Sequence, residues 1–171
     1  MTIVITGPES TGKSTLAAFL ANHYQGVVIP EFARDYIEGL HRPYNYQDIV
    51  IVARKQIEDL KLNQQNGKGL LFLDTYLIIT KVWFEVVFKS APDWIIEEIR
   101  NSKIDLYLLC APDIPWIADS VRENGGEMRN WLFKEYERNL KQFNLPYKIV
   151  SGIGDKRYNC ALNLVDLLIS N

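Results

Sequence analysis

The sequence predicts an α/β protein in which a five-stranded parallel sheet lies between two layers of helices. The candidate strands are short and apolar without regular polar alternation, as in strands that are covered on both faces. They are residues 2–6, 26–29, 70–73, 104–109 and 147–151. Segments with helical periodicity separate them, and such alternation favours parallel pairing through right-handed crossovers. We therefore expect a three-layer α/β/α fold.

Helices are predicted where apolar residues recur every three or four positions. Such stripes are formed by Ile49, Ala53, Ile57 and Leu60, by Leu132, Tyr136, Leu140 and Phe143, and by Ala161, Leu164, Val165 and Leu168. Residues 76–88 are rich in β-branched and aromatic side chains, which favours a strand by propensity. Because a strand continuing from residue 70 to residue 88 would be far longer than normal, we predict a buried helix there instead.

Composition and charge narrow the class of protein. The 171 residues are 47% hydrophobic and carry a formal net charge of −2, which suits a single domain over residues 1–171. The near-balanced charge argues against nucleic acid or an anionic membrane as a partner. Cys110 and Cys160 lack the spacing of a disulfide framework or a zinc site. No apolar run resembles a membrane span or a signal peptide, so we expect a soluble cytoplasmic protein.

The stretch GPESTGKS, residues 7–14, joins the first predicted strand to a run of helix formers. It matches G-x-x-x-x-G-K-[ST], the phosphate loop or P-loop, in which backbone N–H groups and a helix N-terminus face phosphate oxygens. The residues expected to contact ATP are Gly7, Glu9, Ser10, Thr11, Gly12, Lys13, Ser14 and Thr15. Within this set, Lys13 should reach the β- and γ-phosphates, and the Ser14 hydroxyl should coordinate Mg²⁺.

A carboxylate at the end of another strand supports a nucleotide site. The run LLFLD ends an apolar strand on Asp74, as a Walker B strand does when it presents a carboxylate toward Mg²⁺. The alternative is an aspartate that caps the following helix. Beside a P-loop we favour the metal role, so Ser14 and Asp74 are the expected metal ligands.

The remaining sequence favours a P-loop kinase over other P-loop classes. A guanine-binding N/T-K-x-D motif is absent, and the chain is short for an ATPase core with a helical lid domain. A kinase needs an acceptor pocket, and ligands of open α/β sheets bind at the carboxyl ends of strands. The run PEFARDY follows the second strand there and offers Glu31, Arg34 and Asp35. A surface ion pair on a capped helix explains this spacing equally well.

A kinase also needs a basic segment that closes over the phosphates. The connection after the fourth strand carries Arg122, a Gly-Gly pair and Arg129, as such a lid does. A solvated loop with scattered charges is the alternative. Trp116 stands in the same connection. Its ring could fasten the loop to the core, or it could stack on a flat cationic ring of a ligand.

From end to end, the chain resembles one family. The segments that carry the resemblance are GPESTGKST, PEFARDY, RPYNYQDI, LLFLDT, KVWFEV, DLYLLC, DIPWIADSVR and LPYKIVSG, in this order. The series is similar to the ribosylnicotinamide kinase domain of NadR-type proteins, including stand-alone versions of that domain. The P-loop is common to many families, whereas the Glu-x-x-Arg-Asp-Tyr segment and the Pro-Trp lid entry are specific to this one.

The resemblance implies phosphorylation of the 5′-hydroxyl of nicotinamide riboside by ATP and Mg²⁺, giving nicotinamide mononucleotide for NAD synthesis. Residues implied to act in phosphotransfer are Lys13, Asp74, Arg122 and Arg129. Residues implied to contact the riboside are Glu31, Arg34, Tyr36, Trp116 and Asp119. The pyridinium of this substrate would gain roughly 0.5–2 kcal/mol from stacking on a tryptophan. Asp74 and Asp35 are both candidates for the base that takes the hydroxyl proton.

One position departs from the family pattern. The strand end commonly reads D-T-D in the family, whereas this chain has Asp74-Thr75-Tyr76. The loss of the second carboxylate makes a kinase for another nucleoside or small metabolite the second hypothesis. The third is a regulatory module that binds ATP without efficient phosphotransfer.

Overall fold

The computed structural model describes residues 1–67, 69–118 and 124–170. Within these ranges, five strands form one sheet in the order β2-β3-β1-β4-β5, and all neighbouring strands are parallel. The strands are β1 (Thr2–Thr6), β2 (Val27–Ile29), β3 (Leu71–Asp74), β4 (Leu106–Cys110) and β5 (Tyr147–Val150). The predicted five-stranded parallel sheet is confirmed, and the strand ends differ from the expected ones by at most two residues.

Seven helices occur along the described chain. They are α1 (Lys13–Tyr24), α2 (Phe32–Glu38), α3 (Tyr46–Gln65), α4 (Leu77–Phe88), α5 (Asp93–Asn101), α6 (Gly126–Gln142) and α7 (Asp155–Ile169). The three predicted apolar stripes belong to α3, α6 and α7. Within the described ranges, no helix combines the length and the apolar character that crossing a membrane requires.

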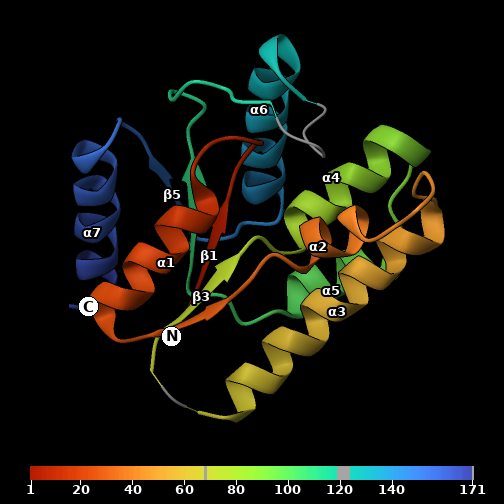
Figure 1. The fold of residues 1–171 in the computed structure, drawn as a ribbon. Helices are drawn as coiled ribbons and strands as arrows, with labels where there is room; N and C mark the ends of the chain where they lie inside the picture. Colours follow the sequence, from red (N-terminus) through yellow and green to blue (C-terminus); the bar gives the residue numbers. More distant parts are fainter. Residues whose placement is uncertain (68, 119–123, 171) are drawn as a thin grey trace.

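The helices cover both faces of the sheet and form the two outer layers (Figure 1). On one face, α1 and α7 pack against Ile3 and Ile5 of β1. On the opposite face, α3 to α6 pack against Val4 of β1 and Leu73 of β3. Neighbouring residues of β1 enter different cores because successive side chains of a strand point to opposite faces. The expected three-layer arrangement follows from this alternation.

Helix α4 occupies the segment whose composition favoured a strand. Most of its surface is buried, including Leu77, Ile78 and Phe84. Burial on several sides explains the β-branched and aromatic content, since packing outweighs intrinsic propensity in a core helix. Lys81 is also buried, and its Nζ donates to Glu85 Oε1 at 2.6 Å and to Asn139 Oδ1 at 2.7 Å. The second bond ties α4 to α6.

The order of the strands determines where a ligand can bind. The helix that follows β1 covers one face of the sheet, whereas the helices that follow β3 and β4 cover the other. A crevice therefore opens outside the carboxyl end of β1, between connections that leave in opposite directions. The register pairs Ile5 of β1 with Asp74 of β3, so the P-loop and the Asp74 carboxylate lie at the same edge of the sheet.

Tyr76 belongs to the core under α3, α4 and α5. It is only 1% exposed, and its hydroxyl lies 2.9 Å from Ser102 Oγ, just after α5. Burial raises the pKa of Tyr76 to about 12. The position at which the family pattern led us to expect a carboxylate thus holds a packed aromatic ring in this chain.

We expect Tyr76→Asp to destabilise the protein by about 3 kcal/mol or more, because it deletes a buried ring and leaves a carboxylate in an apolar site. This corresponds to a fall in Tm of about 6–12 °C for a chain of this size. Thermal unfolding followed by circular dichroism measures the change. Tyr76→Phe is the control and should cost only about 1 kcal/mol. An unchanged Tm for Tyr76→Asp would contradict the core assignment.

Candidate functional site

The P-loop curls at the carboxyl end of β1, immediately before α1. Gly7 has a φ of 141°, and a Cβ added there would lie 2.7 Å from the carbonyl oxygen of Cys110. Gly12, with a φ of 72°, precedes the first residue of α1. Both positions need glycine, for the close approach to β4 and for the left-handed turn into the helix. The loop therefore has the backbone shape that its motif predicts.

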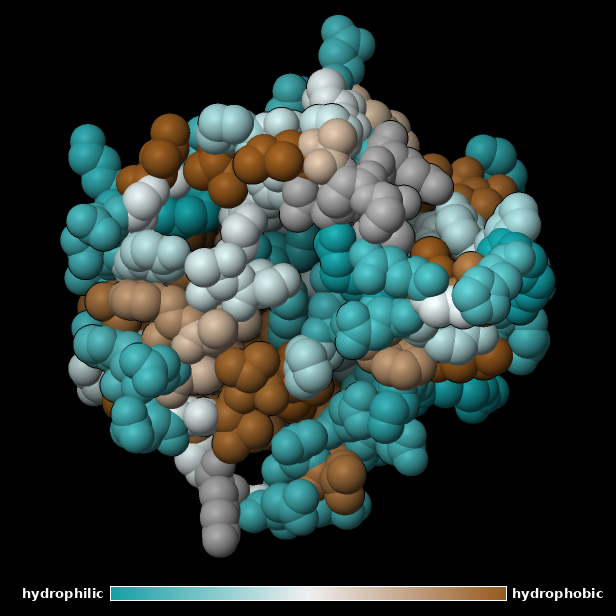
Figure 2. Space-filling model, viewed as in Figure 1, coloured by the Kyte–Doolittle hydropathy of each residue, from teal (hydrophilic) through white to brown (hydrophobic). Residues whose placement is uncertain are grey.

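A cleft of about 1060 Å³ begins at the P-loop and extends between α2, α3, α4 and α6. This volume is at the upper limit for a single small-molecule site, so a nucleotide and an acceptor fit side by side. Figure 2 shows a hollow between the half of this face that carries α1 and the more hydrophilic half that carries α2 and α3. All eight residues expected to contact ATP line the cleft, namely Gly7, Glu9, Ser10, Thr11, Gly12, Lys13, Ser14 and Thr15.

Lys13 lines the cleft, and Asp74 lies within electrostatic reach of it beside the small cavity after β3. Lys13 Nζ donates to the carbonyl oxygen of Pro8 at 2.9 Å. Burial raises the pKa of Asp74, while a hydrogen bond from Ser14 and the positive charge of Lys13 act in the opposite direction. Asp74 Oδ1 is buried and has no hydrogen-bond partner among the described residues.

The pair Ser14 and Asp74 fits a Mg²⁺ ion. A buried carboxylate oxygen without a protein partner is costly unless a ligand satisfies it, and oxygen is the donor that this ion prefers. Within the described ranges, no three His, Cys, Asp or Glu side chains are grouped so as to hold a metal by themselves. Phosphate and water oxygens would thus complete the coordination of the ion.

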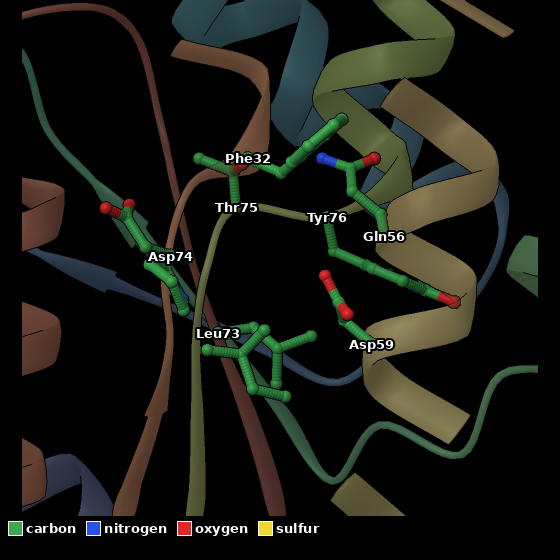
Figure 3. Close-up of a pocket in the computed structure, with 9 residues that line it drawn as sticks. Phe32, Gln56, Asp59, Leu73, Asp74, Thr75 and Tyr76 are labelled. Carbon is green, nitrogen blue, oxygen red and sulfur yellow. The ribbon is translucent and has the colours of Figure 1, made fainter. Parts of the chain in front are cut away.

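The chain bends sharply after β3. Figure 3 shows Asp74 and Tyr76 on opposite sides of the backbone that leaves this strand, with Thr75 between them. Thr75 has a φ of 71°, a left-handed conformation that is rare for a β-branched residue. Such strain is concentrated at functional sites because the surrounding structure must hold it in place. The small cavity beside the bend, about 10 Å³, has room for roughly one water molecule.

The acceptor residues predicted after β2 separate in the structure. Glu31 precedes α2, and Glu31 and Arg34 both line the cleft. Burial raises the pKa of Glu31, and the nearby Lys13 charge lowers it. Asp35 is exposed and does not line the cleft. Tyr36 also lies off the cleft, and its hydroxyl donates to Asp48 Oδ1 at 3.0 Å.

We use the name acceptor wall for the cleft-lining residues of α2 and of the loop that follows it. They are Ala33, Arg34, Ile37, Glu38, Leu40, Arg42, Pro43 and Tyr44. Arg34 Nε and Glu38 Oε1 are 3.4 Å apart on this wall. None of the residues of α2 is buried. The wall is therefore a thin layer over the cleft rather than part of the core.

Sequence reasoning missed the aromatic residues of the cleft. The ring centroids of Tyr44 and Trp83 are 5.1 Å apart, with an interplanar angle of 75°, and both residues line the cleft. Tyr136 of α6 lines it as well. The spacing of Ile79, Trp83 and Val86 along α4 placed these residues on one helix face. That signal was present, but it did not distinguish a cleft face from a core face.

Gln56 is a second residue that sequence reasoning missed. Thr80 Oγ1 donates to Gln56 Oε1 at 2.7 Å, and both residues line the cleft. Figure 3 shows the amide nitrogen of Gln56 directed toward Phe32 and Thr75. Because the amide oxygen is occupied by Thr80, Gln56 presents hydrogen-bond donors to the cleft.

Trp116 does not line the cleft. Its ring packs against Gly125, where an added Cβ would lie 3.2 Å from the indole. The indole Nε1 is buried and has no hydrogen-bond partner among the described residues. The contact lies within the connection between β4 and α6, and the role of Trp116 stays a prediction.

Arg129 supports the outer turn of the P-loop. It lies in the first turn of α6 and is 6% exposed. Its guanidinium donates to the carbonyl oxygens of Glu9 at 3.0 Å, Ser10 at 2.7 Å and Ile114 at 2.8 Å. The Glu9 carboxylate in turn accepts two hydrogen bonds from Asn124. The expected action of Arg129 in phosphotransfer stays a prediction. The roles of Arg122 and Asp119 also stay predictions, because both residues lie outside the described ranges.

A family model described as an AAA domain matches residues 2–157. The trifunctional NAD biosynthesis/regulator protein NadR of Escherichia coli (strain K12) is 28% identical over 153 residues, which cover 83% of this chain. NadR of Salmonella typhimurium is 26% identical over 153 residues, or 85% of the chain. The match spans 37% of the length of both relatives.

Solved structures agree with this relationship. A NadR protein in complex with NR superimposes with a TM-score of 0.86 at 26% identity, over 99% of this chain and 52% of that chain. A thymidylate kinase from Ehrlichia chaffeensis superimposes with a TM-score of 0.65 at 13% identity, over 98% of both chains. The second likeness concerns the fold alone. With its P-loop, parallel sheet and similarity to NadR, the chain belongs to the AAA domain family whose model spans nearly all of it.

Proposed function

We propose that this protein is a nucleoside kinase that transfers the γ-phosphate of ATP to the 5′-hydroxyl of nicotinamide riboside. The observation that carries the proposal is the cleft that joins the P-loop to the acceptor wall and to the pair Tyr44 and Trp83, which we call the aromatic corner. The likeness to a NadR structure in complex with NR supports this choice of acceptor.

The phosphate end of the cleft supplies charge and hydrogen-bond donors to ATP. Lys13 exchanges the Pro8 carbonyl for the β- and γ-phosphate oxygens, which a flexible lysine side chain permits. Backbone N–H groups of the P-loop hold the same oxygens. Ser14 and Asp74 would hold Mg²⁺, which neutralises the charge that develops on the transferred phosphoryl group.

Glu31 is the carboxylate best placed to accept the proton of the acceptor hydroxyl. It lines the cleft near Lys13, where the γ-phosphate of a bound nucleotide would lie. Its raised pKa makes it a better proton acceptor than an ordinary glutamate. Asp35, which the sequence offered for this role, faces solvent, and Asp74 is assigned to the metal.

The aromatic corner is proposed to receive the base. Tyr44 and Trp83 offer an apolar, electron-rich surface, which suits a pyridinium ring through stacking and cation–π attraction. The Gln56 amide, held by Thr80, can donate to an acceptor oxygen such as that of the base carboxamide. Trp83 takes the role that the sequence suggested for Trp116.

A kinase for another nucleoside remains the second candidate. Tyr76 stands where the family pattern has its second carboxylate and is buried in the core, so this chain offers no carboxylate to an acceptor from that position. The volume of the cleft also admits bases larger than nicotinamide.

We expect ADP release with MgATP to depend on added nicotinamide riboside, and to be lower with uridine, cytidine or deoxynucleosides. A coupled spectrophotometric assay over this panel measures the preference.

Lys13→Ala should lower kcat about 10²- to 10³-fold, because it removes a charge aimed at the transferred group. Turnover confined to another nucleoside would select the second candidate, and ATP binding without any turnover would select a regulatory module.

We expect Trp83→Ala to raise the KM for the riboside about tenfold or more, through lost stacking and lost packing. The KM for ATP should change less than twofold. Trp116→Ala is the comparison, since it removes an indole of equal size outside the cleft. If Trp116→Ala raised the riboside KM more than Trp83→Ala, the base would stack on Trp116, as the sequence first suggested.

We expect the activity to fall as the pH drops through the pKa of Glu31, because its protonated form cannot accept the hydroxyl proton. Burial raises that pKa. The acidic limb of kcat/KM should therefore lie at a higher pH than the ordinary glutamate pKa of about 4.3. Glu31→Gln should lower kcat about 10²-fold or more and remove this limb. Asp35→Asn should leave both nearly unchanged, and the opposite pattern would make Asp35 the base.

A further inference from the structure

The acceptor wall has few apolar anchors of its own. Helix α2 buries none of its residues, and Arg42 and Pro43 in the following loop are exposed. The wall nevertheless lines the cleft from Ala33 to Tyr44. Its position must therefore be set mainly by specific polar contacts rather than by burial of apolar surface.

Those contacts converge on one carboxylate. Asp48, in the first turn of α3, is 2% exposed. Arg42 donates to it through both terminal nitrogens, at 2.7 Å and 2.8 Å. The Tyr36 hydroxyl donates at 3.0 Å and the Asn45 backbone N–H at 2.7 Å. Asp48 thus accepts hydrogen bonds from α2, from the loop and from the start of α3.

This arrangement exceeds what a helix cap requires. The capping box of α3 needs only the exchange between Asn45 and Asp48. The fork of Arg42 and the Tyr36 hydroxyl are additional, and bidentate charge-assisted bonds fix geometry closely. The Arg42 guanidinium holds the pKa of Asp48 well below its usual range, so the carboxylate stays ionised around neutral pH.

The fixed segment carries the residue that forms the aromatic corner. Tyr44 lies between Arg42 and Asn45, both of which are bonded to Asp48. Its ring meets Trp83 edge to face. Asp48 itself does not line the cleft, so any effect on the acceptor must act through the wall.

We propose that Asp48 is the positioning residue of the acceptor site, which sets the affinity for the nucleoside by holding the acceptor wall and Tyr44 against Trp83. The inference rests on the proposed function for the identity of the ligand, but not for the position of the wall. The P-loop lies outside this network, so the affinity for ATP is independent of Asp48.

Asp48→Asn tests the proposal because it keeps the shape of the side chain and removes its charge. We expect the KM for nicotinamide riboside to rise about tenfold or more, with the KM for ATP within twofold of the wild-type value. Arg42→Gln should give a smaller change in the same direction, since Tyr36 and Asn45 keep their bonds to Asp48.

Asn45→Ala is the matched control. It removes the side-chain cap of the same helix but leaves every hydrogen bond that Asp48 accepts, including that from the Asn45 backbone. We expect Asn45→Ala to lower Tm, with the riboside KM within twofold of the wild-type value. An equal rise in riboside KM for Asn45→Ala and Asp48→Asn would overturn the proposal, because the effect would then come from the stability of α3.

Hydrogen exchange measured by mass spectrometry supplies a readout that needs no substrate. In Asp48→Asn, amides of residues 33–44 should exchange at least tenfold faster, while β1 and β3 keep their protection. Unchanged exchange over residues 33–44 would overturn the proposal. If the wild-type protein phosphorylates no nucleoside, the proposed function fails, and the exchange result still decides whether Asp48 holds the wall.

Discussion

The parallel pairing of β1 with β3 is the constraint on which the site depends. It places the turn after β1 beside the carboxylate at the end of β3, and the proposed metal–phosphate site needs both segments. The same sheet directs the helix after β1 to one face, and it directs the helices after β3 and β4 to the other face. The crevice that results brings the P-loop, Lys13 and Asp74 to one edge of the sheet.

Around this point the molecule divides its tasks between rigid and thinly supported parts. The P-loop is fixed by glycine geometry, by β4 and by the Arg129 guanidinium. The acceptor wall has little buried surface and relies on a single ionised carboxylate. Under the proposed function, a site built in this way keeps the phosphate chemistry constant, while the surface for the nucleoside can change through substitutions that leave the core intact.

The sequence predicted the layers, the sheet and the phosphate loop because these depend on local pattern. Short apolar runs, helical stripes and a glycine-lysine motif each reflect contacts within a few residues. The position of Trp116 and the roles of Trp83 and Gln56 depend on which helix face meets the cleft, and this is decided by packing between α3, α4 and α6. Tyr76 shows the same limit, since only the direction of the bend at Thr75 reveals that its ring enters the core.

The placement of the tryptophans has a spectroscopic consequence. The chain has four tryptophans, and all lie within the described ranges. Trp83 alone among them lines the cleft, whereas Trp94 lies under the Arg54 guanidinium, Trp116 packs on Gly125 and Trp131 is exposed on α6. If the proposed function holds, Trp83 is the tryptophan whose emission should respond directly to an acceptor, which would give the protein its own optical reporter of that part of the cleft.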